Sequence, residues 1–353
     1  MVSNYDLAQI ALSLYVAATL GLSGSASWDF GSCQYSGRCT MKEFLFSPYL
    51  DINIPTTAIS QPTKSANVAP QLLVESPAGA IPQDMKALTL AFATGECGNE
   101  RWGGRHSKEI VGSTIKSLRR AGIAYVISTG GAQGVFNCST DEGMAQFIAH
   151  YDSSYLMGFD FDIEANQPEA AVTALVEQIG AAMRRKPYLR FSFTLAAQSG
   201  AGTTRGSLNR QGDLVMQAIA RAGLKNYFVN LMVMNFGEAK SNNCVVESEH
   251  CDMAASAIQV IRNFSRQYSV PLRRIEVTPM IGVNDVTANV FTLSDARALA
   301  SFVSTNGLGG LHFWSLNRDQ PCAQSLSAVS PTCSSLDGLR SLEFTNTFAI
   351  DSH

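Results

Sequence analysis

The stretch YLMGFDFDIEANQ, residues 155–167, carries three carboxylates at every second position of a run that is otherwise largely apolar. The acids alternate with large apolar side chains in the order Phe159, Asp160, Phe161, Asp162, Ile163, Glu164. Side chains two residues apart on a β-strand share a face, so the stretch predicts a strand with acids on one side and apolar groups on the other. Carboxylates at this spacing cannot all ionise cheaply, and at least one should hold or share a proton near neutral pH.

Further apolar runs recur along the chain and are rich in Val, Ile, Phe and Tyr, as buried parallel strands are. With residues 155–164, the predicted strands are 44–52, 86–94, 124–131, 190–196, 227–237, 274–282 and 310–318. Predicted helices lie between or after them at 107–122, 139–153, 168–186, 207–223, 251–268, 293–307 and 334–344. This alternation favours an α/β fold, a (β/α)8 TIM barrel, over a doubly wound open sheet, because no glycine-rich dinucleotide motif follows the first strand.

In such a barrel the acids of residues 155–167 face the interior, and Glu164 falls at the C-terminal end of its strand, where barrel active sites lie. A buried acid ladder satisfied by Arg or backbone groups is the structural alternative, but inward charges are costly without a function. Carboxylates also bind Mg²⁺ or Ca²⁺, yet no nearby His or further Asp cluster supports a metal site. The pattern therefore indicates an acid group used in catalysis, with no metal or cofactor.

The composition is that of a globular protein with a large core, since 46% of the 353 residues are apolar and only 16% are charged. The net charge of -3 and the lack of any Lys/Arg run argue against nucleic acid or an anionic membrane as partner. A neutral or polar substrate fits better, and we expect a monomer.

We expect one barrel domain over residues 44–353, preceded by an N-terminal segment over residues 1–43. The apolar run at 10–22 resembles the central part of a secretion signal, although the residues before it carry no positive charge. An uncleaved helix packed on the domain is an equal alternative, and the run is too short for a membrane span.

The eight cysteines suggest disulfides in surface loops. Tight spacing pairs Cys33 with Cys39, Cys244 with Cys251 and Cys322 with Cys333, which leaves Cys97 for Cys138. No C-x-x-C spacing or neighbouring His pair supports zinc. Bridges of this kind imply an oxidising compartment, so the chain is expected to be secreted or extracytoplasmic; free thiols in a cytosolic protein are the alternative.

Several short motifs together resemble glycoside hydrolase family 18, the chitinase family. DFDIE resembles its D-x-D-x-E signature, and STGG at 128–131 resembles the S-x-G-G motif that ends its third strand. LMVMNFG at 231–237, TPMIGVND at 278–285 and FWSLNRDQPC at 313–322 resemble the sixth, seventh and eighth strands of the bacterial chitinases. The resemblance covers roughly residues 44 to 322, and the motifs are specific only jointly.

The resemblance implies a retaining, substrate-assisted hydrolysis of β-1,4-N-acetylglucosaminide bonds in chitin or its oligomers, without a cofactor. Glu164 would protonate the glycosidic oxygen and later activate water. The N-acetyl group of the substrate would be the nucleophile, oriented by Asp162. Asp160 would hold the shared proton and tune Asp162.

The resemblance also implies substrate contacts at the same end of the barrel. Trp314 would form the apolar floor under the sugar ring, and Asn235 would lie beside the acetamide. Further candidates are Tyr49, Gln133, Met232 and Asn284. Trp102 is either an outer platform for the sugar chain or a loop anchor. Met234 stands where many members have a tyrosine, and Met157 where many have a further aspartate.

Two other functions remain open from the sequence. An endo-β-N-acetylglucosaminidase acting on glycoprotein glycans or peptidoglycan would use the same residues. A non-catalytic chitin-binding lectin is disfavoured because such proteins usually lose the acid that Glu164 supplies here. With three tryptophans in the chain, the substrate cleft should be modest.

Overall fold

The computed structural model describes residues 44–54, 85–164, 166–199, 207–326 and 328–350. The N-terminal segment 1–43 and the Cys33–Cys39 bridge lie outside these residues, so both stay predictions. Within the described ranges, no helix combines the length and the apolar character that crossing a membrane requires.

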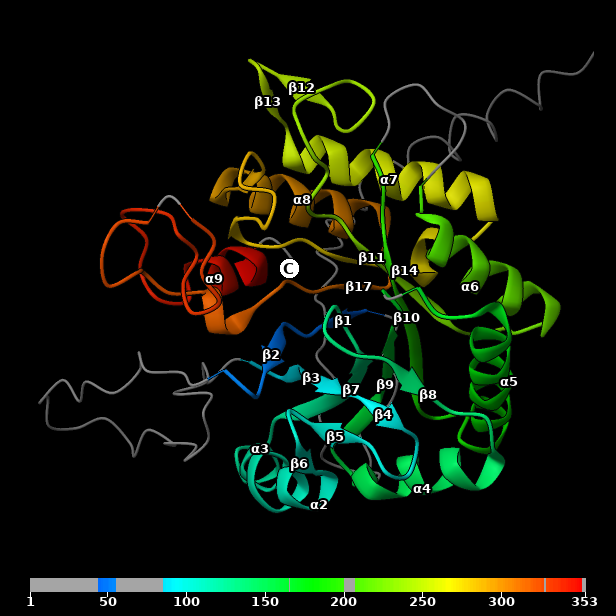
Figure 1. Cartoon of the computed structure of the whole chain (residues 1–353). Coiled ribbons are helices and arrows are strands. Elements are labelled where there is room, and N and C mark those ends of the chain that lie inside the picture. The colour runs from blue at the N-terminus through cyan, green and yellow to red at the C-terminus, as the bar shows by residue number, and fades with distance from the viewer. Residues whose placement is uncertain (1–43, 55–84, 165, 200–206, 327, 351–353) are drawn as a thin grey trace, which may run out of the picture. The chain divides into compact units, whose positions relative to one another are not determined.

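The central sheet is parallel throughout and closes on itself (Figure 1). Its order is β1 (Leu45–Phe46), β17 (Gly310–Leu311), β14 (Ile275–Thr278), β11 (Phe228–Met232), β10 (Arg190–Ala196), β9 (Leu156–Asp162), β7 (Ala124–Gly130), β3 (Ala87–Ala93) and β2 (Tyr49–Asp51). The two short segments β1 and β2 are halves of one predicted strand, and they pair with β17 and with β3 respectively. This double pairing joins the two ends of the sheet, so the predicted (β/α)8 barrel is confirmed.

Helices follow the strands around the outside of the barrel (Figure 1). They are α2 (Ser107–Ile110), continued by the π-turn η1 (Val111–Ile115) and α3 (Lys116–Arg120), α4 (Asp141–Tyr151), α5 (Glu169–Arg185), α6 (Arg210–Arg221), α7 (Met253–Tyr268), α8 (Leu293–Asn306) and α9 (Glu343–Ile350). Short 3₁₀ turns are η2 (Leu272–Arg274) and η3 (Leu316–Arg318). Except for the last, the predicted helices are present with ends shifted by three residues or fewer.

The prediction for the last helix is wrong. Residues 334–344 were expected to be helical, but Ser335, Gly338 and Leu342 have φ of 59°, 75° and 64°, which no right-handed helix tolerates. Helix α9 begins later, where the Asp319 carboxylate accepts hydrogen bonds from two free backbone N–H groups of its first turn. The eighth strand is also shorter than predicted, because the chain turns into η3 after Ser315.

Short strand pairs shape the loops beyond the main sheet. They are β4 (Gly95–Glu96) with β8 (Phe136–Asn137), β5 (Arg101–Trp102) with β6 (Arg105–His106), β12 (Val246–Glu247) with β13 (His250–Cys251), and β15 (Gly282–Val283) with β16 (Val290–Phe291). Disulfides join Cys97 to Cys138, Cys244 to Cys251 and Cys322 to Cys333, as predicted. The first of them fastens the loop after β3 to the loop after β7.

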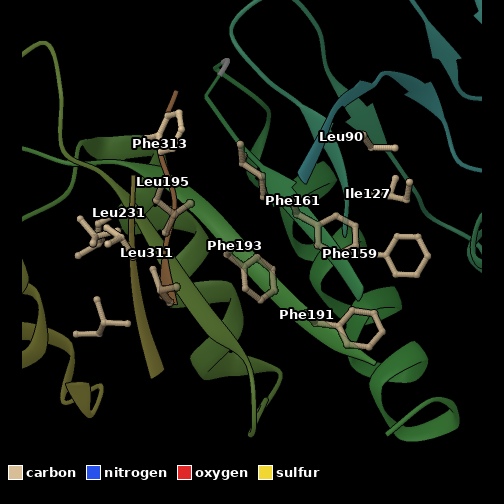
Figure 2. Close-up of a cluster of buried hydrophobic side chains, with 14 of the residues drawn as sticks. Leu90, Ile127, Phe159, Phe161, Phe191, Phe193, Leu195, Leu231, Leu311 and Phe313 are labelled. Carbon is tan, nitrogen blue, oxygen red and sulfur yellow. The ribbon is translucent and has the colours of Figure 1, made fainter. Parts of the chain in front are cut away.

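Aromatic side chains on the outer face of β9 and β10 pack beneath the helices (Figure 2). Phe159 and Phe161 are at most 1% exposed, and each ring lies 6.1 Å from its neighbour on β10, Phe191 or Phe193. Burying each such ring stabilises the fold by about 1.5–3 kcal/mol. The predicted alternation is therefore confirmed: the apolar residues of β9 point outward, and the acids between them point into the barrel.

An ion-pair cluster fills the barrel interior on the far side of Asp160 from the strand ends. Arg190 donates from Nε to Glu276 Oε1 at 2.6 Å, and His312 Nε2 lies 3.5 Å from Glu276 Oε2. Burial alone would raise the pKa of Glu276, but the charges and hydrogen bonds of Arg190 and His312 lower it to about 2. This paired layer closes the barrel below the acids, so the interior opens toward the C-terminal ends of the strands.

Candidate active site

Asp160 is held by four hydroxyl groups. The residue is only 2% exposed. Its Oδ2 accepts hydrogen bonds from Ser128 at 2.6 Å and from Tyr49 at 2.9 Å. Oδ1 accepts from Ser192 at 2.8 Å and Thr194 at 2.7 Å. Ser128 and Ser192 are the register partners of Asp160 on the two neighbouring strands, which is why their side chains reach it. Burial raises the pKa of Asp160, and the four hydrogen bonds oppose that rise.

Asp162 and Glu164 are neighbouring carboxyl groups, and each influences the pKa of the other. Burial, followed by the charges of Glu164 and Asp160, raises the pKa of Asp162 well above its usual value. Burial also raises the pKa of Glu164; the hydrogen bond with Asp162 opposes this rise, and the charge of Asp285 adds to it. Two carboxyl groups this close cannot both ionise cheaply, so a single proton held between them is the favoured state. Oδ1 of Asp162 is buried and has no hydrogen-bond partner among the described residues.

The glycines of the STGG motif allow β7 to approach Asp162 closely. A Cβ atom on Gly130 would lie 2.0 Å from the backbone oxygen of Asp162, and its φ of +83° also favours glycine. The backbone N–H of Gly131 donates to that same oxygen at 3.2 Å. The motif therefore places Ser128 on Asp160 and fixes the backbone of Asp162.

A cavity of about 320 Å³ opens above the carboxyl pair. It is lined by Tyr49, Asp51, Ile54, Phe92, Ala132, Gln133, Asp162, Glu164, Thr194, Met232, Met234, Asn235, Thr278, Met280, Asp285, Trp314, Arg318, Val329 and Pro331. The Trp314 ring stacks on Phe92 with centroids 5.5 Å apart and planes at 18°, which leaves a flat aromatic wall beside the acids. Its size and its mixed apolar and polar lining are typical of a site for a small molecule.

Most of the predicted site residues meet in this cavity. Asp162 and Glu164 line it together with the expected contacts Trp314, Asn235, Tyr49, Gln133 and Met232, while Asp160 lies beneath Asp162. Tyr49 also donates to Asp160, so it serves the acids as well as the cavity wall.

Asn284 is not a contact residue, contrary to prediction. It is fully buried, and its Nδ2 donates to the backbone oxygens of Met280 and Gly282 at 2.9 and 3.1 Å. Its Oδ1 accepts from the backbone of Asn235 at 3.2 Å, so it braces the loops instead. The neighbouring Asp285 lines the cavity in its place.

Trp102 is a loop anchor and no sugar platform. It is 0% exposed, and its Nε1 donates to the Tyr151 hydroxyl at 2.8 Å. Of the two tryptophans in the described ranges, Trp314 alone lines the cavity.

Arg318 is a site residue that the sequence did not reveal. The guanidinium is buried and donates to the backbone oxygens of Ile281 and Val283 at 2.8 and 2.6 Å, and also to that of Ser330. Burial lowers its pKa to about 10. It thereby clamps the loop stapled by Cys322–Cys333 against the barrel, and that loop contributes Val329 and Pro331 to the cavity wall.

Among known proteins, the chain is similar to chitinases. A scan against protein-family models matches none. The chain is 30% identical over 257 residues to endochitinase 11 of Metarhizium anisopliae, covering 67% of this chain and 48% of that protein. It is 29% identical over 264 residues to a probable bifunctional chitinase/lysozyme of Escherichia coli K12, covering 68% of this chain and 28% of that protein. The chain thus spans at most about half the length of these curated relatives.

Solved structures match over most of both chains. The catalytic domain of a hyperthermophilic chitinase from Pyrococcus furiosus has 26% identity and a TM-score of 0.64, with 88% of this chain and 95% of that chain covered. Catalytic-site mutants of active domain 2 of the thermostable chitinase from the same organism, complexed with chito-oligosaccharides, give 26% identity and a TM-score of 0.65 over the same shares. Because the relatives come from such different organisms, they do not single out the bacterial subgroup.

Proposed function

The chain belongs to glycoside hydrolase family 18, and from that membership we propose that it hydrolyses β-1,4-N-acetylglucosaminide bonds in chitin or chitooligosaccharides with retention of configuration. The observation that carries the proposal is the proton-sharing pair of Asp162 and Glu164, set beside the Trp314 wall in a cavity of about 320 Å³.

The carboxyl groups act side by side in the proposed reaction. Glu164, whose pKa burial raises, donates its proton to the glycosidic oxygen as the bond to C1 breaks. The acetamide oxygen of the same sugar attacks C1 and forms an oxazolinium ion. Asp162 accepts the N–H of that ring through its unpartnered Oδ1, and its charge stabilises the cation.

The second half of the proposed reaction returns every group to its starting state. Glu164, now ionised, takes a proton from water, and the resulting hydroxide equivalent attacks C1. The oxazolinium ring opens, the acetamide is restored, and the sugar keeps its original configuration.

The contact between the two carboxyls argues for attack by the substrate itself. Retaining enzymes that use their own nucleophile keep the acid and nucleophile about 5–5.5 Å apart, on opposite sides of the bond. Here Asp162 and Glu164 lie two residues apart in the chain and line the same cavity, so both are on one side of the bond. Asp285 also lines the cavity, so its substitution provides the necessary control for an enzyme nucleophile.

The test is product analysis on N-acetylglucosamine oligomers, with fully deacetylated oligomers as control. We expect β-anomeric products, no cleavage of the deacetylated control and competitive inhibition by N-acetylglucosamine thiazoline, which mimics the cyclised intermediate. Efficient cleavage of deacetylated oligomers, or a sugar trapped covalently on Asp162 or Asp285, would overturn the mechanism. Faster turnover of peptidoglycan or glycoprotein glycans than of chitin oligomers would replace the proposed substrate.

We also propose that the protein works outside the reducing cytosol. The three disulfides among the described residues support an oxidising compartment. Thiol labelling of protein from its natural source should find these six cysteines blocked; reactive thiols at Cys97 and Cys138 would contradict the proposal.

A further inference from the structure

A buried amide on β11 lies next to the hydroxyls that hold Asp160. Asn230 is 1% exposed, and its Nδ2 lies 2.9 Å from the Tyr49 hydroxyl and 2.9 Å from Thr194 Oγ1. On its other side, Oδ1 accepts from Thr278 Oγ1 at 2.8 Å. The residue does not line the cavity, so it reaches the substrate only through other side chains.

The amide of Asn230 restricts the direction in which the hydrogens of this network can point. An amide nitrogen has two hydrogens and accepts none, so Tyr49 and Thr194 both accept from Asn230. Each hydroxyl can still donate its one hydrogen, and each lies within hydrogen-bond distance of Asp160. When both hydroxyls donate to Asp160, the 3.0 Å contact between the Tyr49 and Thr194 oxygens carries no hydrogen of its own.

We propose that Asn230 is a positioning residue that turns the hydroxyls of Tyr49 and Thr194 toward Asp160, so that Asp160 stays a fixed negative charge while the mobile proton is confined to Asp162 and Glu164. The inference rests on the proposed function, which it deepens. It also revises the role expected from the sequence, in which Asp160 held the shared proton.

The strands beside Asp160 present hydroxyl, amide or acid side chains at its level, and the paired charges of Arg190, Glu276 and His312 lie in the layer below it. Tyr49 comes from β2, Ser128 from β7, Ser192 and Thr194 from β10, Asn230 from β11 and Asp162 from its own strand β9. In the described part of the chain, no Lys, Arg or His forms an ion pair with Asp160. The charge is therefore stabilised by oriented hydroxyls, whose direction decides how well they do so.

The pKa values of Asp160 and Asp162 differ in the direction that the proposal requires. Burial raises the pKa of both, but the rise is larger for Asp162, which lacks hydroxyl donors and faces two acids. The proton consequently favours the outer pair, next to the cavity where the glycosidic oxygen would lie.

Two substitutions at Asn230 test the direction of the network. In Asn230→Leu the hydroxyls of Tyr49 and Thr194 can bond each other, and Asp160 loses one donor. In Asn230→Asp the new carboxylate takes both hydrogens away. We expect the acidic limb of the kcat/KM–pH profile to move to higher pH in both, with the larger shift in Asn230→Asp and the alkaline limb unchanged. Losing one hydrogen bond should lower kcat/KM roughly two- to tenfold.

Thr278→Val offers a near-isosteric variant that keeps the amide and frees it to rotate. It should shift the acidic limb in the same direction but less. Ser265→Ala removes a hydroxyl outside the network, bonded to the backbone of Val270 at 2.8 Å, and should leave the profile unchanged.

An infrared measurement separates this inference from the proposed function. The difference between wild type and Asp160→Asn should show no protonated carboxyl band at neutral pH, whereas the same difference in the Asn230→Asp background should show one. This measurement needs no substrate, so it tests the inference even if the protein hydrolyses no oligomer. A lack of hydrolysis would contradict only the proposed function. A protonated Asp160 band in the wild type, or unchanged acidic limbs in both Asn230 variants, would overturn the inference.

Discussion

Asn235 donates a hydrogen bond from Nδ2 to Oδ2 of Asp285 at 3.0 Å, which links the loops after β11 and β14 across the rim of the cavity. Oδ1 of Asn235 accepts from the backbone of Val286 at 2.9 Å, so the amide is held at both ends. A neutral amide positions Asp285 without cancelling its charge. That charge is one of the influences that raise the pKa of Glu164, after burial.

The first prediction concerns this charge. In Asp285→Asn the pKa of Glu164 should fall, because a nearby negative charge no longer disfavours its ionisation. Glu164 must be protonated to act as the acid, so the alkaline limb of kcat/KM should move to lower pH. Asp141→Asn, on the outer surface of α4, is the matched control and should leave the limb in place. An unmoved limb in Asp285→Asn would show that this carboxylate does not tune the acid.

The arrangement of acids on β9 was predictable from the sequence because strand geometry is local. The period of two places Asp160, Asp162 and Glu164 on one face wherever the strand lies. The same period puts Asn230 inside the barrel, two residues before Met232. Its partner Tyr49 is 181 residues away, however, and that distance hid its contact with the acids.

The loops could not be predicted in this way. Whether Asn284 or Asp285 reaches the cavity depends on how the chain turns after β14, and no period governs a turn. The start of α9 depends on Asp319, which caps it from 25 residues earlier. Arg318 gave no signal either, since its role follows from backbone oxygens of three separate residues.

The second prediction concerns the disulfides. Cys97–Cys138 spans 41 residues, against 11 for Cys322–Cys333 and 7 for Cys244–Cys251. In the chain-entropy model its loss should cost about 4 kcal/mol, compared with about 2.5–3 kcal/mol for either of the others. Urea unfolding of the three paired Cys→Ser variants should rank them in that order. Only the Cys322/Cys333 variant should also raise KM, because its loop carries the cavity-lining residues Val329 and Pro331. Equal KM values in all three variants would contradict a role of this loop in substrate binding.

The third prediction concerns the acid itself. Glu164→Gln keeps the shape of the side chain but has no proton of suitable acidity to donate. Hydrolysis of N-acetylglucosamine oligomers should fall roughly 10²–10⁴-fold, with little change in unfolding. Glu177→Gln, an exposed position on α5, is the matched control and should retain full activity. Near wild-type rates in Glu164→Gln would remove this residue from the mechanism.

The last prediction is that Asp162→Asn stabilises the protein while impairing turnover. Because the folded-state pKa of Asp162 is raised, the folded state binds more protons than the unfolded state above the ordinary pKa of 3.8, and the free energy of unfolding falls as pH rises through that window. Asparagine does not titrate, so the variant should gain about 1–2 kcal/mol at pH 7. The gain should vanish below the ordinary pKa, where the carboxyl is protonated in both states. Asp160→Asn is the contrasting variant: its amide would meet hydroxyls that now donate to a carboxylate, which should cost about 1–3 kcal/mol. Urea unfolding of both variants at neutral and acidic pH measures these differences. An Asp162→Asn protein that is no more stable than the wild type at pH 7 would mean that burying the Asp162 carboxyl group does not lower the free energy of unfolding.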